Sequence, residues 1–244
     1  MEAKLEELVK RLQQALQANL KSVVLFGSAV TGEFSEPHSD VNLLCVVGDA
    51  GLSSLETIHE AVKDWVQKGN PAPLVFTLHG LNHSADVFAI ELLDIREKRR
   101  VLYGPDIFEN LEVPTRWHRR QVERELRLNC LRLRQHIVTA PKNERARLEL
   151  MVASVSSFVA LFRHGLMEID GVRIESSAQV ADRAAALVSA DPGAFHAILK
   201  LKKDPGGTNK IDVEQTLHGY LEMAELFTAE IDRRFESDDR RPNF

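Results

Sequence analysis

Hydrophobic positions along the first eighty residues follow helical spacing in some stretches and strand-like spacing in others. Residues 2–18 repeat apolar side chains every three or four positions, which predicts an amphipathic helix. Residues 22–26 and 41–47 are apolar at nearly every position and rich in β-branched side chains, which predicts two strands buried on both faces. A second helical pattern over 55–68 and a short apolar run over 74–77 complete the order helix, strand, strand, helix, strand. This order is typical of a small mixed sheet with packed helices.

The next stretch, residues 83–104, has near-helical spacing of apolar side chains, so a further helix is expected there. It carries three acids that either lie on a solvated helix face or reach a site: Asp86, Glu91 and Asp94. His79, His83 and Asp86 are also spaced for one helix face, where such a trio would suit a metal ion. The favoured interpretation of the two histidines is an exposed start of a helix.

The remainder of the chain is almost wholly helical in its pattern. Apolar periodicity predicts five helices, over 115–139, 144–168, 177–189, 192–201 and 211–235. Such a series forms a helical bundle. The expected fold is therefore an α+β N-terminal domain, a small mixed sheet with packed helices, followed by an all-α helical bundle. The predicted division is a first domain over 1–104, a proline-containing linker over 105–114, a bundle over 115–235 and a loose tail over 236–244.

The composition is ordinary for a soluble globular protein: 44% of the 244 residues are hydrophobic and 27% are charged. No uninterrupted apolar run approaches the ~20 residues needed to cross a bilayer, so no membrane association is expected. The charged, helical N-terminal stretch is unlike a signal peptide. Cys45 and Cys130 lack metal-type spacing, and Cys45 lies inside a predicted buried strand. These features predict a cytoplasmic protein with reduced cysteines.

Charge is distributed unevenly along the chain. The formal net charge of −5 argues against a dedicated nucleic-acid binder, yet residues 95–134 contain eleven Lys or Arg and six Asp or Glu. Five arginines in this region recur at spacings of three, four or seven: Arg116, Arg120, Arg124, Arg127 and Arg134. One interpretation is a stripe that holds the phosphates of a nucleotide or an RNA backbone. The other is a solvated helix face paired with Glu123 and Glu125.

The residues that join the first two predicted strands carry the candidate chemistry. Gly27-Ser28 ends the first strand, where glycine permits a sharp turn close to a ligand and serine offers a hydroxyl and an N–H to a phosphate. Asp40 enters the second strand. Because side chains alternate along a strand, Asp40 and Asn42 are expected to project to the same side.

This stretch resembles the signature of the nucleotidyltransferase superfamily, which includes DNA polymerase β, the kanamycin nucleotidyltransferases and the minimal nucleotidyltransferases. The family pattern is Gly-Ser, a loop, then Asp-x-Asp or Asp-x-Glu before apolar residues; here Gly27-Ser28 precedes Asp40-Val41-Asn42. The resemblance, nearest to the kanamycin-type and minimal members with a C-terminal helical domain, implies transfer of NMP from an NTP with Mg²⁺ or Mn²⁺. The expected site residues are Asp40 for catalysis, Asp40 and Asn42 for the metal, and Gly27, Ser28, Arg120 and Arg124 for the nucleotide.

The sequence departs from the family pattern at Asn42, which offers a cation a neutral oxygen where the family has a carboxylate. Residues 74–77, LVFT, also lack the acid that the family usually carries on its third strand. Two-metal transfer relies on such carboxylates, so weak activity is expected, on a small molecule, a protein or an RNA. The alternative is a catalytically inactive relative that acts as a nucleotide-binding or protein-interaction module. A homodimer, in which a second chain supplies the missing acid, is a further arrangement.

Overall fold

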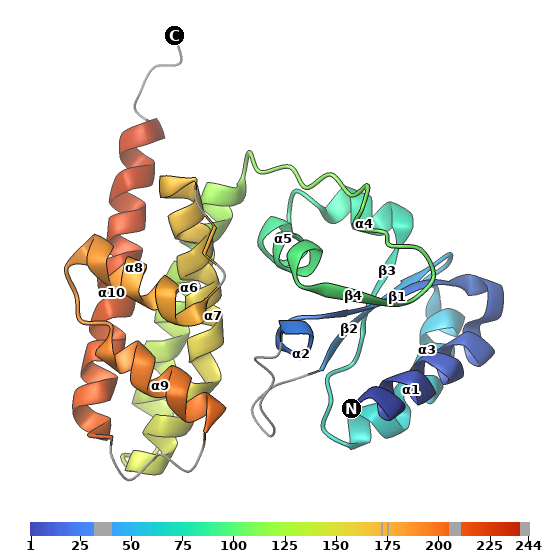
Figure 1. Cartoon of the computed structure of the whole chain (residues 1–244), viewed down its shortest axis with the longest axis horizontal. Coiled ribbons are helices and arrows are strands. Elements are labelled where there is room, and N and C mark those ends of the chain that lie inside the picture. Colours follow the sequence, from blue (N-terminus) through green and yellow to red (C-terminus); the bar gives the residue numbers. More distant parts are fainter. Residues whose placement is uncertain (32–40, 172, 175, 205–210, 240–244) are drawn as a thin grey trace. The chain divides into compact units, whose positions relative to one another are not determined.

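The chain folds into two compact units, residues 1–115 and 116–244, in a computed structural model that describes residues 1–31, 41–171, 173–174, 176–204 and 211–239. The first unit is a four-stranded sheet with helices on both faces (Figure 1). Its elements in chain order are α1 (Glu2–Leu16), the short 3-10 helix η1 (Gln17–Asn19), β1 (Leu20–Phe26), α2 (Ser28–Thr31), β2 (Asn42–Val47), α3 (Leu52–Gln67), β3 (Leu74–Thr77), α4 (Leu78–Ser84), α5 (Ala89–Glu97) and β4 (Arg99–Tyr103).

The sheet is mixed, with the strand order β3-β2-β1-β4. β1 lies between β2 and β4 and is antiparallel to both, whereas β2 and β3 are parallel. The residues of β1 from Ser22 to Leu25 and of β2 from Leu43 to Val47 are all buried. Continuous apolar runs predict this burial, because both faces of the strands are covered. β1 begins earlier than predicted, at Leu20, which pairs with the last residue of β2.

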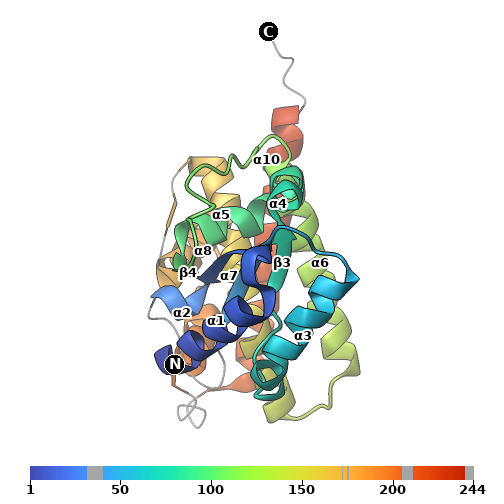
Figure 2. The same ribbon diagram turned by 90° about the vertical axis from the view of Figure 1, so that its right-hand side faces the viewer.

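Different helices cover the two faces of the sheet. On one face, α1 and α3 lie side by side (Figure 2). The residues of α1 buried there form the apolar stripe of the predicted helix: Leu5, Leu8, Val9, Leu12 and Leu16. On the other face lie α4, α5 and the segment 105–113, from which Phe108 and Leu111 are buried. The sheet is therefore the middle layer of three. Because helices cover both of its faces, strand residues can contact a ligand only where the strands end.

The prediction of a single helix over 83–104 is wrong. Helical structure begins earlier, at Leu78. The residue before it, Thr77, caps α4, because its hydroxyl accepts a hydrogen bond from the Gly80 N–H. The backbone turns at 85–88, α5 ends at Glu97, and β4 pairs with β1. The residues of β4, RRVLY, begin with two arginines and lack regular alternation of polarity, so they carry no strand signal of their own. Pairing with a buried central strand determines their conformation.

The second unit contains only helices and their connections within the described residues. Its helices are α6 (His118–Thr139), α7 (Glu144–Asp170), α8 (Ser177–Val188), α9 (Gly193–Lys203) and α10 (Val213–Asp239). α7 contacts each of the other four. Aromatic rings in mutual contact fill the centre of the unit: Phe158, Phe162, Phe195, Tyr220 and Phe227. These five helices follow the five predicted periods, which confirms the fold class expected from the sequence.

α7 is, among the described helices, one whose length and composition would suffice to cross a membrane. Over its most apolar window, 56% of the residues are buried inside the unit. A helix at the centre of a bundle meets the same criterion as a membrane span, because both are apolar around most of their circumference.

Both cysteines are buried and unbridged. Burial raises the pKa of the Cys45 thiol to about 12, so this thiol stays protonated and unreactive at neutral pH. Its place in the centre of β2 agrees with the core role predicted from the sequence.

Candidate functional site

Three strands meet at the end of the sheet where the candidate residues lie. Phe26, the last residue of β1, pairs with Asn42 of β2 on one side and with Arg99 of β4 on the other. Residues directly opposite each other on antiparallel strands project to the same face, so the three form one row across the sheet. Gly27 follows immediately, and its N–H donates to the Lys98 carbonyl oxygen over 3.2 Å. This bond, together with the pairing of Phe26 with both neighbouring strands, holds the glycine turn in place.

Gly27 has a φ of 80°, in the left-handed region that glycine occupies without steric cost. Its carbonyl oxygen accepts a hydrogen bond from the Val30 N–H over 3.1 Å, which closes the turn into α2. A Cβ atom at Gly27 would lie 3.3 Å from Nδ2 of Asn42. The turn and the first residue of β2 are thus neighbours, and the missing side chain leaves space beside the Asn42 amide.

Asn42 is half-buried, and none of the hydrogen bonds between described side chains involves it. An amide of this kind can offer its oxygen or its NH₂ group to a ligand. Asp40, the predicted catalytic acid, lies outside the described residues. Ser28 begins α2, but its side chain also lies outside the described part of the chain. The site as described therefore consists of the Gly27 backbone and the Asn42 amide.

The described residues do not by themselves fit a magnesium site. They contain no group of three or more His, Cys, Asp or Glu side chains arranged to hold a metal ion. Asp86 lies in the turn between α4 and α5, and Glu91 and Asp94 lie on α5. Mg²⁺ prefers several oxygen ligands, with anionic ones among them. Asn42 offers one neutral oxygen, so a cation here would depend on Asp40 and on phosphate oxygens of a bound nucleotide.

His79 and His83 lie on one face of α4, as their spacing predicts, and both are exposed. Their rings stack with centroids 3.9 Å apart, and Nδ1 of His83 is 2.9 Å from the His79 carbonyl oxygen. They form an exposed helix start, in agreement with the interpretation favoured from the sequence.

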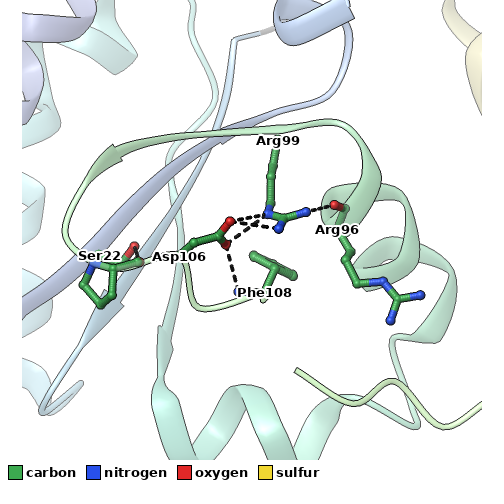
Figure 3. Close-up of polar contacts among 6 residues, drawn as sticks. Ser22, Arg96, Arg99, Asp106 and Phe108 are labelled. Carbon is green, nitrogen blue, oxygen red and sulfur yellow. Dashed lines mark hydrogen bonds and ion pairs between the residues drawn. The ribbon is translucent and has the colours of Figure 1, made fainter. Parts of the chain in front are cut away.

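A charged clamp fixes the segment after β4 onto the sheet (Figure 3). Arg99 donates to Asp106 through Nε, over 3.0 and 3.1 Å to the two carboxylate oxygens, and through Nη2 over 2.8 Å. Its Nη1 donates to a carbonyl oxygen at the end of α5. The Asp106 carboxylate also accepts the Phe108 N–H over 3.1 Å, and the Arg99 guanidinium lies 5.8 Å from the Phe108 ring centroid. Hydrogen bonds from Arg99 lower the pKa of Asp106.

The clamp supports the Gly27 turn indirectly. Arg99 is the β4 residue that pairs with Phe26, and the residue before it supplies the carbonyl oxygen that receives the Gly27 N–H. A second hydrogen bond lies further along β1, where the Ser22 hydroxyl donates to the Pro105 carbonyl oxygen over 2.9 Å. These contacts determine the position of β4, and β4 in turn forms one side of the Gly27 turn. The periodicity of the sequence does not predict which residues make them.

Arg120 and Arg124 lie in the second unit, on the first turns of α6. They line a groove of about 580 Å³, called here the α6 groove. Five arginines, two aromatic rings, one acid and one leucine line it: Arg116, Arg119, Arg120, Arg124, Arg127, Trp117, Phe235, Glu123 and Leu128. The Arg120 guanidinium lies 5.3 Å from the Trp117 ring centroid, and Arg124 pairs with Glu125 over 2.5 Å. The arginines of the stripe thus form ion pairs and also lie beside the aromatic rings of Trp117 and Phe235. The spacing of the arginines in the sequence did not indicate these rings.

A buried polar cluster joins the beginning of α6 to the end of α7. Nδ1 of His118 is 2.5 Å from Oε1 of Glu168, and Nε2 of His118 is 2.9 Å from Nδ1 of His164. Arg119 donates to the other Glu168 oxygen over 3.1 Å. Burial alone would raise the pKa of Glu168, but the hydrogen bonds from His118 and Arg119 outweigh burial and lower it. The partners are 46 to 50 residues apart, a separation at which periodicity gives no signal.

Comparison with solved structures identifies a similar fold. No protein-family model matches the sequence, and no curated protein matches it significantly. The crystal structure of spectinomycin adenyltransferase AAD(9) from Enterococcus faecialis with ATP and spectinomycin is similar over 91% of this chain and 99% of that chain, with 14% identity and a TM-score of 0.57. A crystal structure of a toxin-antitoxin with AMP-PNP covers 50% of this chain and 93% of its own, with 15% identity and a TM-score of 0.33, too low to support a shared fold. The chain therefore has a fold similar to that of an adenyltransferase.

Proposed function

We propose that this chain binds a nucleoside triphosphate at the Gly27 turn and transfers its NMP group to an acceptor with the help of Mg²⁺ or Mn²⁺. The observation that carries the proposal is the close approach of Gly27 to Asn42, two residues after Asp40, at the end of a sheet whose fold is similar to that of an adenyltransferase. The turn gives phosphates access to the backbone, and the adjacent strand carries oxygen donors for a cation.

Each site residue has a role that follows from its chemistry. Gly27 and Ser28 bind phosphates, Asp40 is the anionic metal ligand, and Asn42 is a neutral one. When bound, the cation neutralises charge on the phosphates and on the leaving pyrophosphate. An amide in place of a carboxylate removes a unit charge next to a divalent ion, which weakens the interaction by several kcal/mol even in a screened environment. Slow turnover is therefore part of the proposal.

The similar adenyltransferase was crystallised with ATP and spectinomycin. Its ATP supports a nucleoside triphosphate as the partner of this chain, and its spectinomycin makes a small molecule the first acceptor class to test. A protein side chain and an RNA end are the other acceptor classes.

A second candidate function is nucleotide binding without transfer. The observation in its favour is Asn42 itself, together with the lack of a cluster of three metal ligands among the described residues. Such a protein would bind nucleotide weakly or independently of metal and would act through its helical unit as an interaction module.

Isothermal titration with ATP, CTP, GTP and UTP, each with and without Mg²⁺, tests the shared first step. The variant Asp40→Ala removes the anionic ligand, and Glu56→Ala on the exposed surface of α3 removes an equal charge as a matched control. The proposal expects metal-dependent binding that Asp40→Ala weakens at least about tenfold, equivalent to about 1.4 kcal/mol, and that Glu56→Ala preserves. Absence of binding for all four nucleotides would contradict both candidate functions.

The substitution Asn42→Asp separates them. It restores the carboxylate of the family pattern at a position that is half-buried beside the Gly27 turn. Release of pyrophosphate from the preferred nucleotide should rise in this variant if the natural site is a weakened catalyst. Unchanged background release, with nucleotide binding intact, would favour the binding module.

A further inference from the structure

The α6 groove presents an exposed aromatic ring between positive charges. Trp117 is 44% exposed, although tryptophan is mostly buried in folded proteins. The guanidinium groups of Arg116 and Arg120 lie 5.1 and 5.3 Å from its ring centroid. Both distances are within the range of cation–π attraction. The two guanidinium groups therefore orient the ring, which remains partly exposed to solvent.

Contacts of the two residues that follow Trp117 fix the turn that carries this ring. His118, the residue after Trp117, is fully buried and bonds to Glu168 at the end of α7. Arg119 bonds to the same carboxylate and lies 5.3 Å from the Phe235 ring centroid on α10. The turn that carries Trp117 is thus anchored to two other helices. A fixed platform loses little conformational freedom when a ligand stacks on it.

Arginines continue from the platform along one face of α6. Arg120, Arg124 and Arg127 follow one another by four and three residues, so they span about 10 Å along the helix. The side chains of Arg124 and Arg127 are 71% and 52% exposed, whereas the side chains of their carboxylate partners are 24 to 31% exposed: Glu125, Glu123 and Asp232. Ion pairs whose charged groups reach solvent contribute little to stability. The exposed guanidinium groups can therefore also be reached by a phosphate.

From these observations we propose that the α6 groove binds a single-stranded nucleic acid, with a base stacked near Trp117 and backbone phosphates along Arg120, Arg124 and Arg127. Single-strand binding surfaces combine a positive groove with aromatic platforms, because unpaired bases expose their faces. A duplex hides those faces, and an acidic peptide would use the arginines but not the ring. The groove volume of about 580 Å³ lies in the range of ligand sites. The proposal goes beyond nucleotidyl transfer and requires neither the metal nor the Gly27 turn.

Fluorescence anisotropy with labelled oligouridine and oligodeoxyuridine of about twelve nucleotides tests the proposal. Binding of either strand supports it, and the tighter one identifies the sugar. Trp117→Leu should weaken binding about tenfold or more, whereas Trp117→Phe, which keeps an aromatic face, should retain most of it. Arg120→Glu should also weaken binding and reduce the steepness of its salt dependence, because each lost phosphate contact removes about 0.7 from the logarithmic slope.

Arg145→Glu on α7 is the matched control, since this side chain is 89% exposed and paired within its own helix. It should leave the affinity almost unchanged. The proposal is overturned if neither strand binds, or if Arg145→Glu weakens binding as much as Arg120→Glu. It is equally overturned if Trp117→Leu binds like the natural chain. Displacement of the strand by equimolar ATP, by polyglutamate or by a duplex of the same length would assign the groove to that ligand instead.

Discussion

Replacing Gly27 with alanine tests whether the glycine turn matters for binding as well as for folding. Gly27 has a φ of 80°, and a non-glycine residue in the left-handed region costs about 1–2 kcal/mol. The added Cβ would also lie 3.3 Å from Nδ2 of Asn42, closer than an ordinary contact. Because Asn42 is only half-buried, its amide can rotate away. The substitution should therefore cost about 1–2 kcal/mol of stability, nearly all from the backbone, and displace the amide from its place beside the turn.

Gly69 provides a matched control for the backbone strain. Its φ is 87°, and a Cβ there would meet no atom within 4 Å. Urea unfolding of the two variants should show losses that agree within about 0.5 kcal/mol, since both carry the same kind of strain. Isothermal titration with Mg²⁺ and ATP should show about tenfold weaker binding for Gly27→Ala alone, equivalent to about 1.4 kcal/mol. Unchanged affinity in Gly27→Ala, or an equal loss of affinity in Gly69→Ala, would refute the reasoning.

Three further substitutions test the supports of the two units. Gly104→Ala would place a Cβ 2.0 Å from the Lys21 carbonyl oxygen at a φ of 75°; urea unfolding should show a loss of about 3 kcal/mol or more, and a loss below 1 kcal/mol would contradict this packing. Asp106 has a lowered pKa, so its bond to Arg99 stabilises the fold above about pH 4 and is lost as the pH falls further. In Asp106→Asn, the urea concentration at the unfolding midpoint should therefore fall less below about pH 4 than in the natural chain. An equal fall in both would argue against the Arg99–Asp106 clamp. Glu168→Gln leaves buried partners with a weaker acceptor and should cost about 1–3 kcal/mol in thermal unfolding; an unchanged Tm would show that the cluster is not stabilising.

The first three strands and the helices of the second unit were predictable because their signals are local. β1 and β2 are continuous apolar runs, and α7 keeps its apolar spacing over 27 residues. β4 was not predictable, since its pairing with β1 joins residues far apart in the chain. Its first residue, Arg99, would suit an exposed helix equally well. Only the register that places Arg99 opposite Phe26 shows why it belongs to a strand.

The candidate site shows the same division between local and long-range information. The sequence indicates that Gly27 ends one strand and that Asn42 belongs to the next, but not which end of the sheet brings them together. Antiparallel pairing of Phe26 with Asn42 provides that information. One of the aromatic rings that line the α6 groove belongs to Phe235, near the far end of the chain. The spacing of arginines along α6 does not predict that this ring lies beside them.

Nuclear magnetic resonance with Mn²⁺ and ATP tests most directly whether the nucleotide binds at the Gly27 turn. Bound Mn²⁺ broadens the signals of nearby protons, so the backbone N–H of Gly27 and the side-chain NH₂ of Asn42 should lose intensity first. The N–H of Gly48, which follows the last residue of β2 and lies about 20 Å from Asn42 along the strand direction, should be much less affected. Broadening that spares Gly27 and Asn42 while the Trp117 indole N–H disappears would place the nucleotide elsewhere and contradict the proposed site.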